Sequence, residues 1–184
     1  MKKIIPNITY KSVLSGIKNI DNRNKAFNEL DKQSQRMEIA WDALKLITQN
    51  IIKANLCGYW DGKISEISLS EINAKKFQQE LLKTNNLQNC EVCARGIMML
   101  SLIRIGNTLD PRFDNVRSGS SDSIKGFTID NFLEMENEYE CGVFNHPYHT
   151  NTEEKLANIC CNILINGNFN TKDKKNYITV KNTK

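Results

Sequence analysis

The chain has 184 residues, of which 40% are hydrophobic and 25% are charged, and its formal net charge is +4. This length suits one compact domain with a sizeable core and is too short for two comfortable ones. Residues 1–56 hold ten Lys and Arg against five Asp and Glu, residues 57–166 hold ten against fifteen, and residues 167–184 hold five against one. The net charge of +4 therefore equals that of the C-terminal tail, residues 167–184, and residues 1–166 together are neutral. A neutral body of this kind argues against a nucleic-acid-binding protein.

The first eleven residues, MKKIIPNITYK, have two lysines but only a two-residue apolar run before Pro6. This pattern is not that of a signal peptide. No stretch approaches the roughly 18 apolar residues that a membrane span requires. We therefore expect a cytoplasmic protein without a membrane segment, in which the six cysteines are thiols or metal ligands rather than disulfides.

Helical periodicity dominates the first half of the chain. Apolar residues recur every three or four positions over residues 24–56, at Phe27, Leu30, Met37, Trp41, Leu44, Ile47 and Ile51. We expect Ser34 to divide this stretch into a short and a long helix, with Gly58 as the terminator. Residues 63–69 could form a short β element, and Ser68 with Glu71 makes a capping box that predicts a helix over about 70–84.

The next helix is predicted over about 89–105 and is apolar on every side. Such a helix is expected at the centre of the domain, surrounded by the others. Residues 107–127 are rich in Gly, Ser and Asp and predict a long loop.

Thr128 is expected to begin an acidic helix that reaches about residue 140, with Phe132 and Tyr139 facing inward beside either Met135 or Glu136. A final helix ends at Asn166, before Gly167. The predicted fold is all-α, a single compact domain of about six helices over residues 1–166. Residues 167–184 are predicted to be a polar, basic and flexible tail.

A zinc site is one interpretation of the cysteines and histidines, because C-x2-C is a usual half-site for that metal. Its ligands would come from Cys90, Cys93, Cys141, His146 and His149. The HPYH segment, residues 146–149, does not match a standard second half-site. Cysteines are also common in helical cores, and we favour that interpretation, so no cofactor is expected and zinc remains the alternative.

A reactive thiol at Cys90 is a further alternative. A thiol at a helix N-terminus has a lowered pKa, which favours the nucleophilic thiolate. The motif C-E-V-C lacks the strand-then-helix context of a thioredoxin-like site, and no histidine accompanies it in the sequence.

Arg95 and Arg104 interrupt the apolar helix, and a buried guanidinium requires a carboxylate, carbonyls or an anionic ligand. In one interpretation each arginine pairs with a carboxylate of the acidic helix, at Glu134, Glu136, Glu138 or Glu140. In the other, Arg104 contributes to an anion pocket, because guanidinium groups and Gly/Ser backbone amides suit phosphate. The residues of that pocket would be Arg104, Asn107, Arg112, Arg117, Ser118, Ser120 and Lys125.

The stretch CEVCARGIMMLSLIRIGN, with the downstream segments FLEMENEYE and ILINGNF, resembles small proteins of phages and bacterial mobile elements. The resemblance covers the C-terminal half. It implies an accessory, anti-defence role in phage–host conflict and transfers no catalytic residue.

The favoured hypothesis is a non-enzymatic binding protein that acts on a host macromolecule or a small anionic, nucleotide-like ligand through the 107–127 loop. One alternative is a metal-dependent or thiol enzyme that uses the Cys and His residues. A second is a nucleic-acid-binding protein that uses the basic first 56 residues. A homo-oligomer is compatible with each of these hypotheses.

Overall fold

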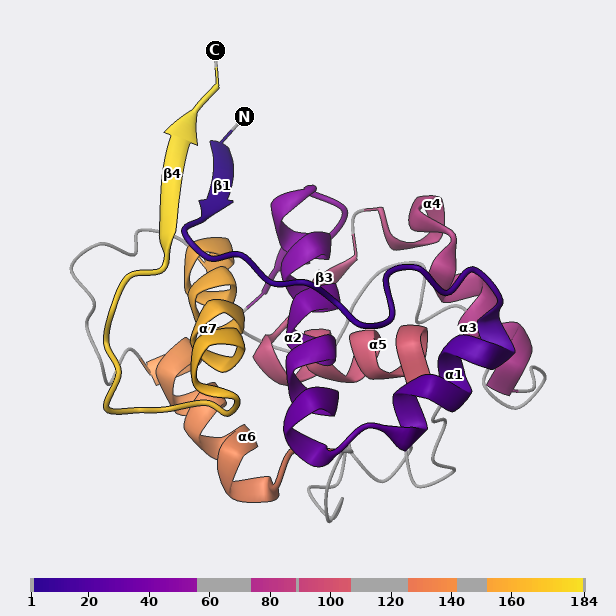
Figure 1. Ribbon diagram of the computed structural model, residues 1–184. Helices are drawn as coiled ribbons and strands as arrows, with labels where there is room; N and C mark the ends of the chain where they lie inside the picture. Colours follow the sequence, from indigo (N-terminus) through magenta and orange to yellow (C-terminus); the bar gives the residue numbers. More distant parts are fainter. Residues whose placement is uncertain (1, 56–73, 89, 107–125, 142–151, 184) are drawn as a thin grey trace.

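The computed structural model describes residues 2–55, 74–88, 90–106, 126–141 and 152–183, which are mostly helical with a small β component (Figure 1). The helices are α1 (Ile20–Glu29), α2 (Lys32–Thr48), α3 (Ala74–Leu82), α4 (Thr84–Leu87), α5 (Ala94–Gly106), α6 (Ile129–Glu136) with its π-helical extension Asn137–Cys141, and α7 (Thr152–Asn166). The strands are β1 (Lys2–Pro6), β2 (Lys53–Ala54), β3 (Glu91–Val92) and β4 (Ile178–Asn182). Strands β1 and β4 pair antiparallel, and β2 and β3 pair parallel.

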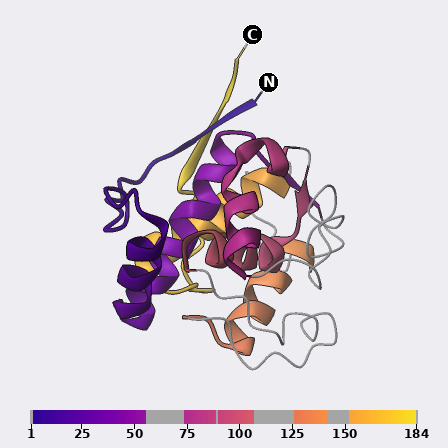
Figure 2. The same ribbon diagram turned by 90° about the vertical axis from the view of Figure 1, so that its right-hand side faces the viewer.

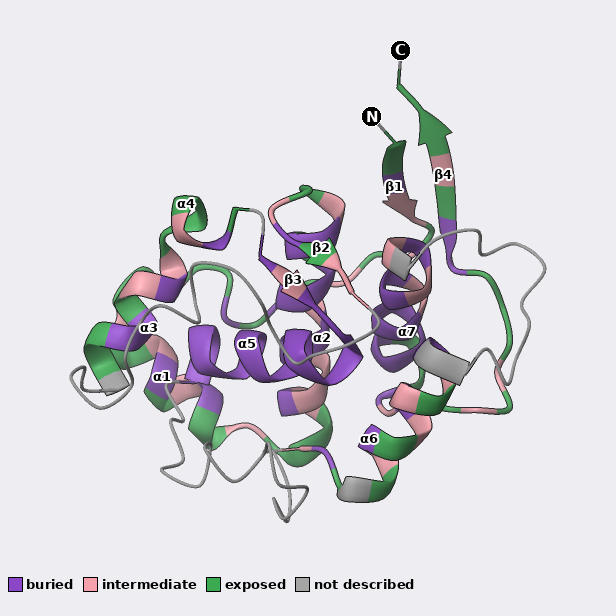
Figure 3. Ribbon diagram, turned by 180° about the vertical axis from the view of Figure 1, so that it is seen from behind, coloured by how far each residue is buried: buried purple, intermediate pink, exposed green. Residues whose placement is uncertain are grey.

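Helix α5 is the central helix, as its all-round apolarity predicts. Every one of its 13 residues is buried, and it packs against α1, α2, α3 and α6 (Figure 3). The helix begins at Ala94 rather than near residue 89, because Glu91 and Val92 pair with β2 as an extended segment.

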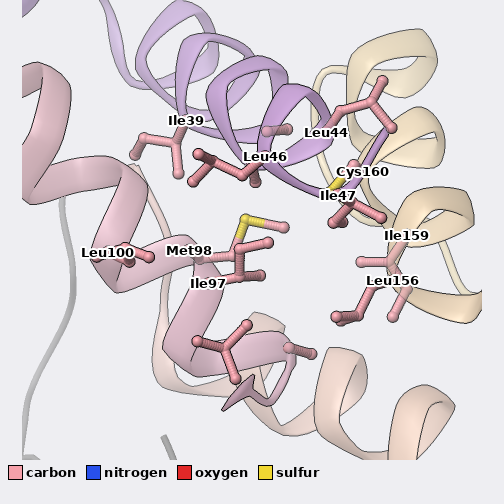
Figure 4. Close-up of a cluster of buried hydrophobic side chains, with 14 of the residues drawn as sticks. Ile39, Leu44, Leu46, Ile47, Ile97, Met98, Leu100, Leu156, Ile159 and Cys160 are labelled. Atoms are coloured by element: carbon pink, nitrogen blue, oxygen red, sulfur yellow. The ribbon is translucent and has the colours of Figure 1, made fainter. Parts of the chain in front are cut away.

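The main core lies between α2, α5 and α7. In Figure 4, side chains from the three helices converge: those of α2 include Ile39 and Leu46, those of α5 include Ile97 and Met98, and α7 contributes Cys160 among others. Burial of such side chains removes apolar surface from water, which is the largest favourable contribution to folding.

The first helical stretch is divided into a short and a long helix as predicted, but the break lies at Leu30 and Asp31, and Ser34, the predicted point of division, lies within α2. The Asp31 carboxylate accepts hydrogen bonds from the Ser34 backbone N–H at 2.8 Å and from the Ser34 hydroxyl at 3.0 Å. These bonds satisfy the first turn of α2 and lower the pKa of Asp31. The long helix then ends at Thr48, earlier than predicted, and Asn50 adopts a left-handed φ of 53° before β2.

The predicted helices of the second half are also present. Thr128 caps α6 in a reciprocal capping box with Asn131, and Phe132, Met135 and Tyr139 are all buried as expected. Helix α7 ends before Gly167, which has a φ of 71° and lies so close to Gln33 that a Cβ atom would clash with it. A non-glycine residue would be strained at that position.

The C-terminal segment differs from the predicted flexible tail. Residues Ile178–Asn182 form β4 against β1, and Phe169, Tyr177 and Ile178 are buried. Three asparagines spaced four residues apart on α7 hold the connecting segment by hydrogen bonds to backbone and side chain, namely Asn158, Asn162 and Asn166. Asn162 alone donates to the carbonyls of Asn170 and Asp173 and accepts from the Asn170 N–H.

Residues 63–69, where a short β element was predicted, lie outside the described residues. Within the described part of the chain, no helix combines the length and apolarity that crossing a membrane would require.

Candidate functional site

Arg104 lies in the last turn of α5 and is 8% exposed. Its Nε donates to Asp42 Oδ2 at 2.8 Å, its Nη2 is 3.5 Å from Asp42 Oδ1, and its Nη1 donates to the Leu81 carbonyl. Asp42 projects from the middle of α2 and is 6% exposed. The guanidinium therefore has a two-point contact with one buried carboxylate and a third contact with the end of α3.

Arg23 and Gln78 complete this cluster around the backbone carbonyl of Arg104. Arg23 Nη2 donates to that carbonyl at 2.9 Å, and Gln78 Nε2 donates to it at 3.0 Å. Gln78 also exchanges amide hydrogen bonds with Asn24, at 3.0 and 2.8 Å. The last carbonyls of a helix have no partner within the helix, so these side chains cap the C-terminal end of α5.

The charges of this cluster, Arg23, Asp42 and Arg104, do not cancel. Burial lowers the pKa of the half-buried Arg23, the neighbouring Asp42 opposes that shift, and the nearby Arg104 adds to it. The Arg23 Nε is buried and makes no hydrogen bond with the described residues. Among the described residues, the end of α5 therefore has two guanidinium groups near one carboxylate, and only that of Arg104 is paired with it.

Arg95 lies at the other end of α5 and is 7% exposed. Its Nη1 is 3.8 Å from Glu136 Oε1, and its guanidinium carbon lies 5.3 Å from the centre of the Phe132 ring. The predicted pairing with the acidic helix is therefore confirmed for Arg95. It is wrong for Arg104, whose carboxylate comes from α2.

Cys90 and Cys93 lie on either side of β3, and both are buried. Cys93, not Cys90, is at the N-terminal end of α5: its carbonyl accepts from the Ile97 N–H at 3.0 Å, and its Sγ accepts from the Gly96 N–H at 3.4 Å. The Cys90 thiol donates to the Asn86 carbonyl at 3.6 Å. The prediction that placed Cys90 at a helix N-terminus is wrong, because β3 separates it from the helix.

The remaining ligands of the hypothetical zinc site are not placed. His146 and His149 lie outside the described residues, and the side chain of Cys141 is likewise not described. The part of the chain that is described contains no group of three or more metal-binding side chains. Cys160 and Cys161 are buried in the core, in line with the favoured interpretation of the cysteines. Burial raises the pKa of Cys161 to about 12 and also raises the pKa of Cys160 well above its ordinary value.

Of the predicted anion pocket, only Arg104 is described. The other members, Asn107, Arg112, Arg117, Ser118, Ser120 and Lys125, lie outside the described residues. Arg104 itself is engaged by Asp42 and Leu81, so its geometry suits a residue that fixes the end of α5.

The buried Glu38 and the half-buried Arg36 were missed by sequence reasoning. Glu38 accepts hydrogen bonds from the Tyr10 hydroxyl at 2.9 Å, the Ser12 hydroxyl at 2.5 Å and the Val13 N–H at 2.8 Å, which holds the N-terminal segment on α2. Arg36 donates to the carbonyls of Gly126 and Gly167, at 2.6 and 2.8 Å. The sequence offered one signal for the burial of Glu38, because this residue directly precedes Ile39 in the buried middle part of α2.

No family model, curated protein or solved structure matches this chain.

Proposed function

We propose that the protein is a non-enzymatic binding protein for a small anionic, nucleotide-like ligand or an anionic site on a host macromolecule. The contact residues would be Asn107, Arg112, Arg117, Ser118, Ser120 and Lys125. Arg104 would act as a positioning residue that fixes the start of this segment. An inhibitor or sequestering role of the kind implied by the resemblance to phage proteins would follow from such binding.

The observation that supports the proposal is the uncompensated charge at the end of α5. Asp42 pairs with Arg104, whereas Arg23 donates to the Arg104 carbonyl and has no ion pair within the described residues, where its Nε also has no hydrogen-bond partner. Excess positive charge in a partly desolvated place attracts anions more strongly than the same charge in water. Arg112, Arg117 and Lys125 follow in the sequence and would add to this attraction.

The proposal is tested by calorimetric titration of the full chain with inorganic pyrophosphate and with a nucleoside triphosphate. We expect saturable binding by the wild type and at least a tenfold loss of affinity in the double variant R112E/R117E. We expect the melting temperature of that variant to stay close to that of the wild type, and this measurement separates a loss of binding from a loss of the fold.

A matched control is K172E/K175E, which changes the net charge equally in an exposed segment near the C-terminus. This control should retain wild-type affinity. Absence of binding by the wild type, or equal losses in both double variants, would contradict the proposal.

A further inference from the structure

The terminal ribbon, formed by β1 and β4, carries basic side chains on its outer face. Its register places Lys3 opposite Lys181 and Ile5 opposite Thr179. Residues paired in an antiparallel ribbon point to the same side, and successive residues alternate. The inner face therefore has Ile4 and Ile178, both buried. On the outer face Lys3, Lys181 and Thr179 are exposed, and Ile5 is half-buried.

The ribbon extends beyond the helices. In Figures 1 and 2 both strands leave the helical body together, and their ends project from it in each of the two views. A two-stranded ribbon alone is only marginally stable in water, so the exposed end depends on the buried Ile4 and Ile178 at its base.

The pair Lys3–Lys181 is unfavourable for folding. Like charges directly opposite each other in an antiparallel pair are destabilising. Over the described ranges, neither lysine has a carboxylate oxygen within 4 Å. By contrast, Lys75 in α3 has its Nζ 2.8 Å from an Asp21 oxygen, and Lys83, just after α3, has its Nζ 2.7 Å from a Glu80 oxygen. The ion pair recorded for the ribbon joins Lys2 to Glu154, at 3.6 Å.

The fold thus brings together basic residues that are far apart in the sequence. Residues 167–184 have five lysines against one acid, and that acid, Asp173, accepts from Asn166 Nδ2 and the Lys175 N–H. Lys2 and Lys3 come from the basic N-terminal part. The prediction that nucleic acid is an unlikely partner rests on the neutral body of the chain, with the excess charge in the C-terminal tail. Strand pairing places Lys181 of that tail beside Lys3, so the ribbon gathers positive charge that the division of the sequence does not show.

The composition of the outer face distinguishes among anionic partners. Lysine is depleted at protein–protein interfaces, so an acidic protein is disfavoured. Membrane binding requires exposed apolar side chains as well as charge, and the exposed large hydrophobic residues of the described chain, Val13, Leu133 and Ile165, are not in the ribbon. Lysine and threonine are typical phosphate contacts in nucleic-acid complexes, and a two-stranded ribbon fits the major groove of DNA.

We propose that the outer face of the β1/β4 ribbon, through Lys3, Lys181 and Thr179, binds the sugar–phosphate backbone of a nucleic acid. This site is separate from the anion site proposed at the end of α5, and either can fail without the other.

The test measures the fluorescence anisotropy of a labelled 24-base-pair duplex DNA with the full chain between 50 and 200 mM KCl. Two or three phosphate contacts predict a slope of log affinity against log salt of about −2 to −3. The variant K3E/K181E should lose at least tenfold in affinity at the lowest salt, with a slope flatter by about 2. This variant still has a like-charge pair at the same register, so the cross-strand repulsion is unchanged.

The matched control is K18E/K32E, which has the same change in net charge at two exposed lysines away from the ribbon. It should bind the duplex within about threefold of the wild type. The neutral variant K3Q/K181Q, checked by circular dichroism, covers the case in which K3E/K181E does not fold, and it should also lose affinity. Equal losses in the control, no binding at 50 mM KCl, or stronger binding to polyglutamate or to phosphatidylserine vesicles than to DNA would overturn the proposal.

Discussion

The two ends of α5 hold an arginine of nearly equal burial in different ways. Arg104 makes a two-point contact with Asp42, at 2.8 and 3.5 Å, and Asp42 has a side-chain exposure of 9%. Arg95 lies 3.8 Å from Glu136, whose side chain is 22% exposed, and also lies over the ring of Phe132. The burial of the arginine alone therefore does not determine its role. The role of each arginine depends on its partner carboxylate and on the access of water to that carboxylate.

The largest difference between the two ends is expected when the carboxylate is removed. Asp42→Ala leaves the buried Arg104 without its counter-charge beside the half-buried Arg23, and removal of one partner of a buried pair costs about 3–5 kcal/mol. Glu136→Ala removes a longer, partly solvated contact, for which about 0–1 kcal/mol is expected. Urea unfolding followed by circular dichroism measures both values.

A second variant keeps this comparison informative if Asp42→Ala does not fold. The double variant Asp42→Leu with Arg104→Met replaces the pair by apolar side chains of similar size, and such replacements are often neutral or stabilising. We expect it to be more stable than Asp42→Ala. Equal costs for Asp42→Ala and Glu136→Ala would contradict the distinction between the two ends.

Conservative replacement of each arginine should give a smaller difference. Arg104→Lys keeps the charge but cannot reach both Asp42 oxygens and the Leu81 carbonyl with the same planar geometry. We expect a loss of about 1–3 kcal/mol, since a hydrogen bond to a buried group is left unmade. Arg95→Lys keeps both the charge near Glu136 and a cation near Phe132, so a loss below about 1 kcal/mol is expected in the same urea measurement. A larger loss in Arg95→Lys than in Arg104→Lys would reverse the assignment.

The central position of α5 could be predicted from sequence because apolarity on every side of a helix leaves no face for solvent. The helix start at Thr128 and the terminator Gly167 were predictable for a similar reason, since each depends on residues within one turn. The division of the first stretch was predicted at Ser34, three residues after the observed cap Asp31. For Arg104 the sequence predicted a carboxylate partner but not which residue provides it. Asp42 is 62 residues away, and a local pattern does not encode which helix packs against which.

A signal for Asp42 was nevertheless present. It lies three residues after Ile39 and four before Leu46, so it shares their buried face of α2. The predicted carboxylate partners of Arg104 all lie in the acidic helix, where the acids are most numerous. The asparagines at 158, 162 and 166 were also visible in the sequence, because a spacing of four places them on one face of a helix. Their hydrogen-bond partners are mainly backbone groups of the C-terminal segment, and no side-chain pattern predicts these partners.

The smallest predicted effect is the response of each pair to salt. The Debye length, beyond which dissolved ions screen exposed charges, falls from about 10 Å at 0.1 M ionic strength to about 3 Å at 1 M. Added salt therefore weakens a partly solvated ion pair, but it screens a buried pair much less. The cost of Glu136→Gln, measured by urea unfolding, should therefore fall toward zero between 0.05 and 1 M NaCl. The cost of Asp42→Asn should persist over the same range, because the Asp42 and Arg104 side chains are only 9% and 10% exposed. A cost of Asp42→Asn that disappears with added salt would mean that water reaches this pair in solution, and the two ends of α5 would then hold their arginines in the same way.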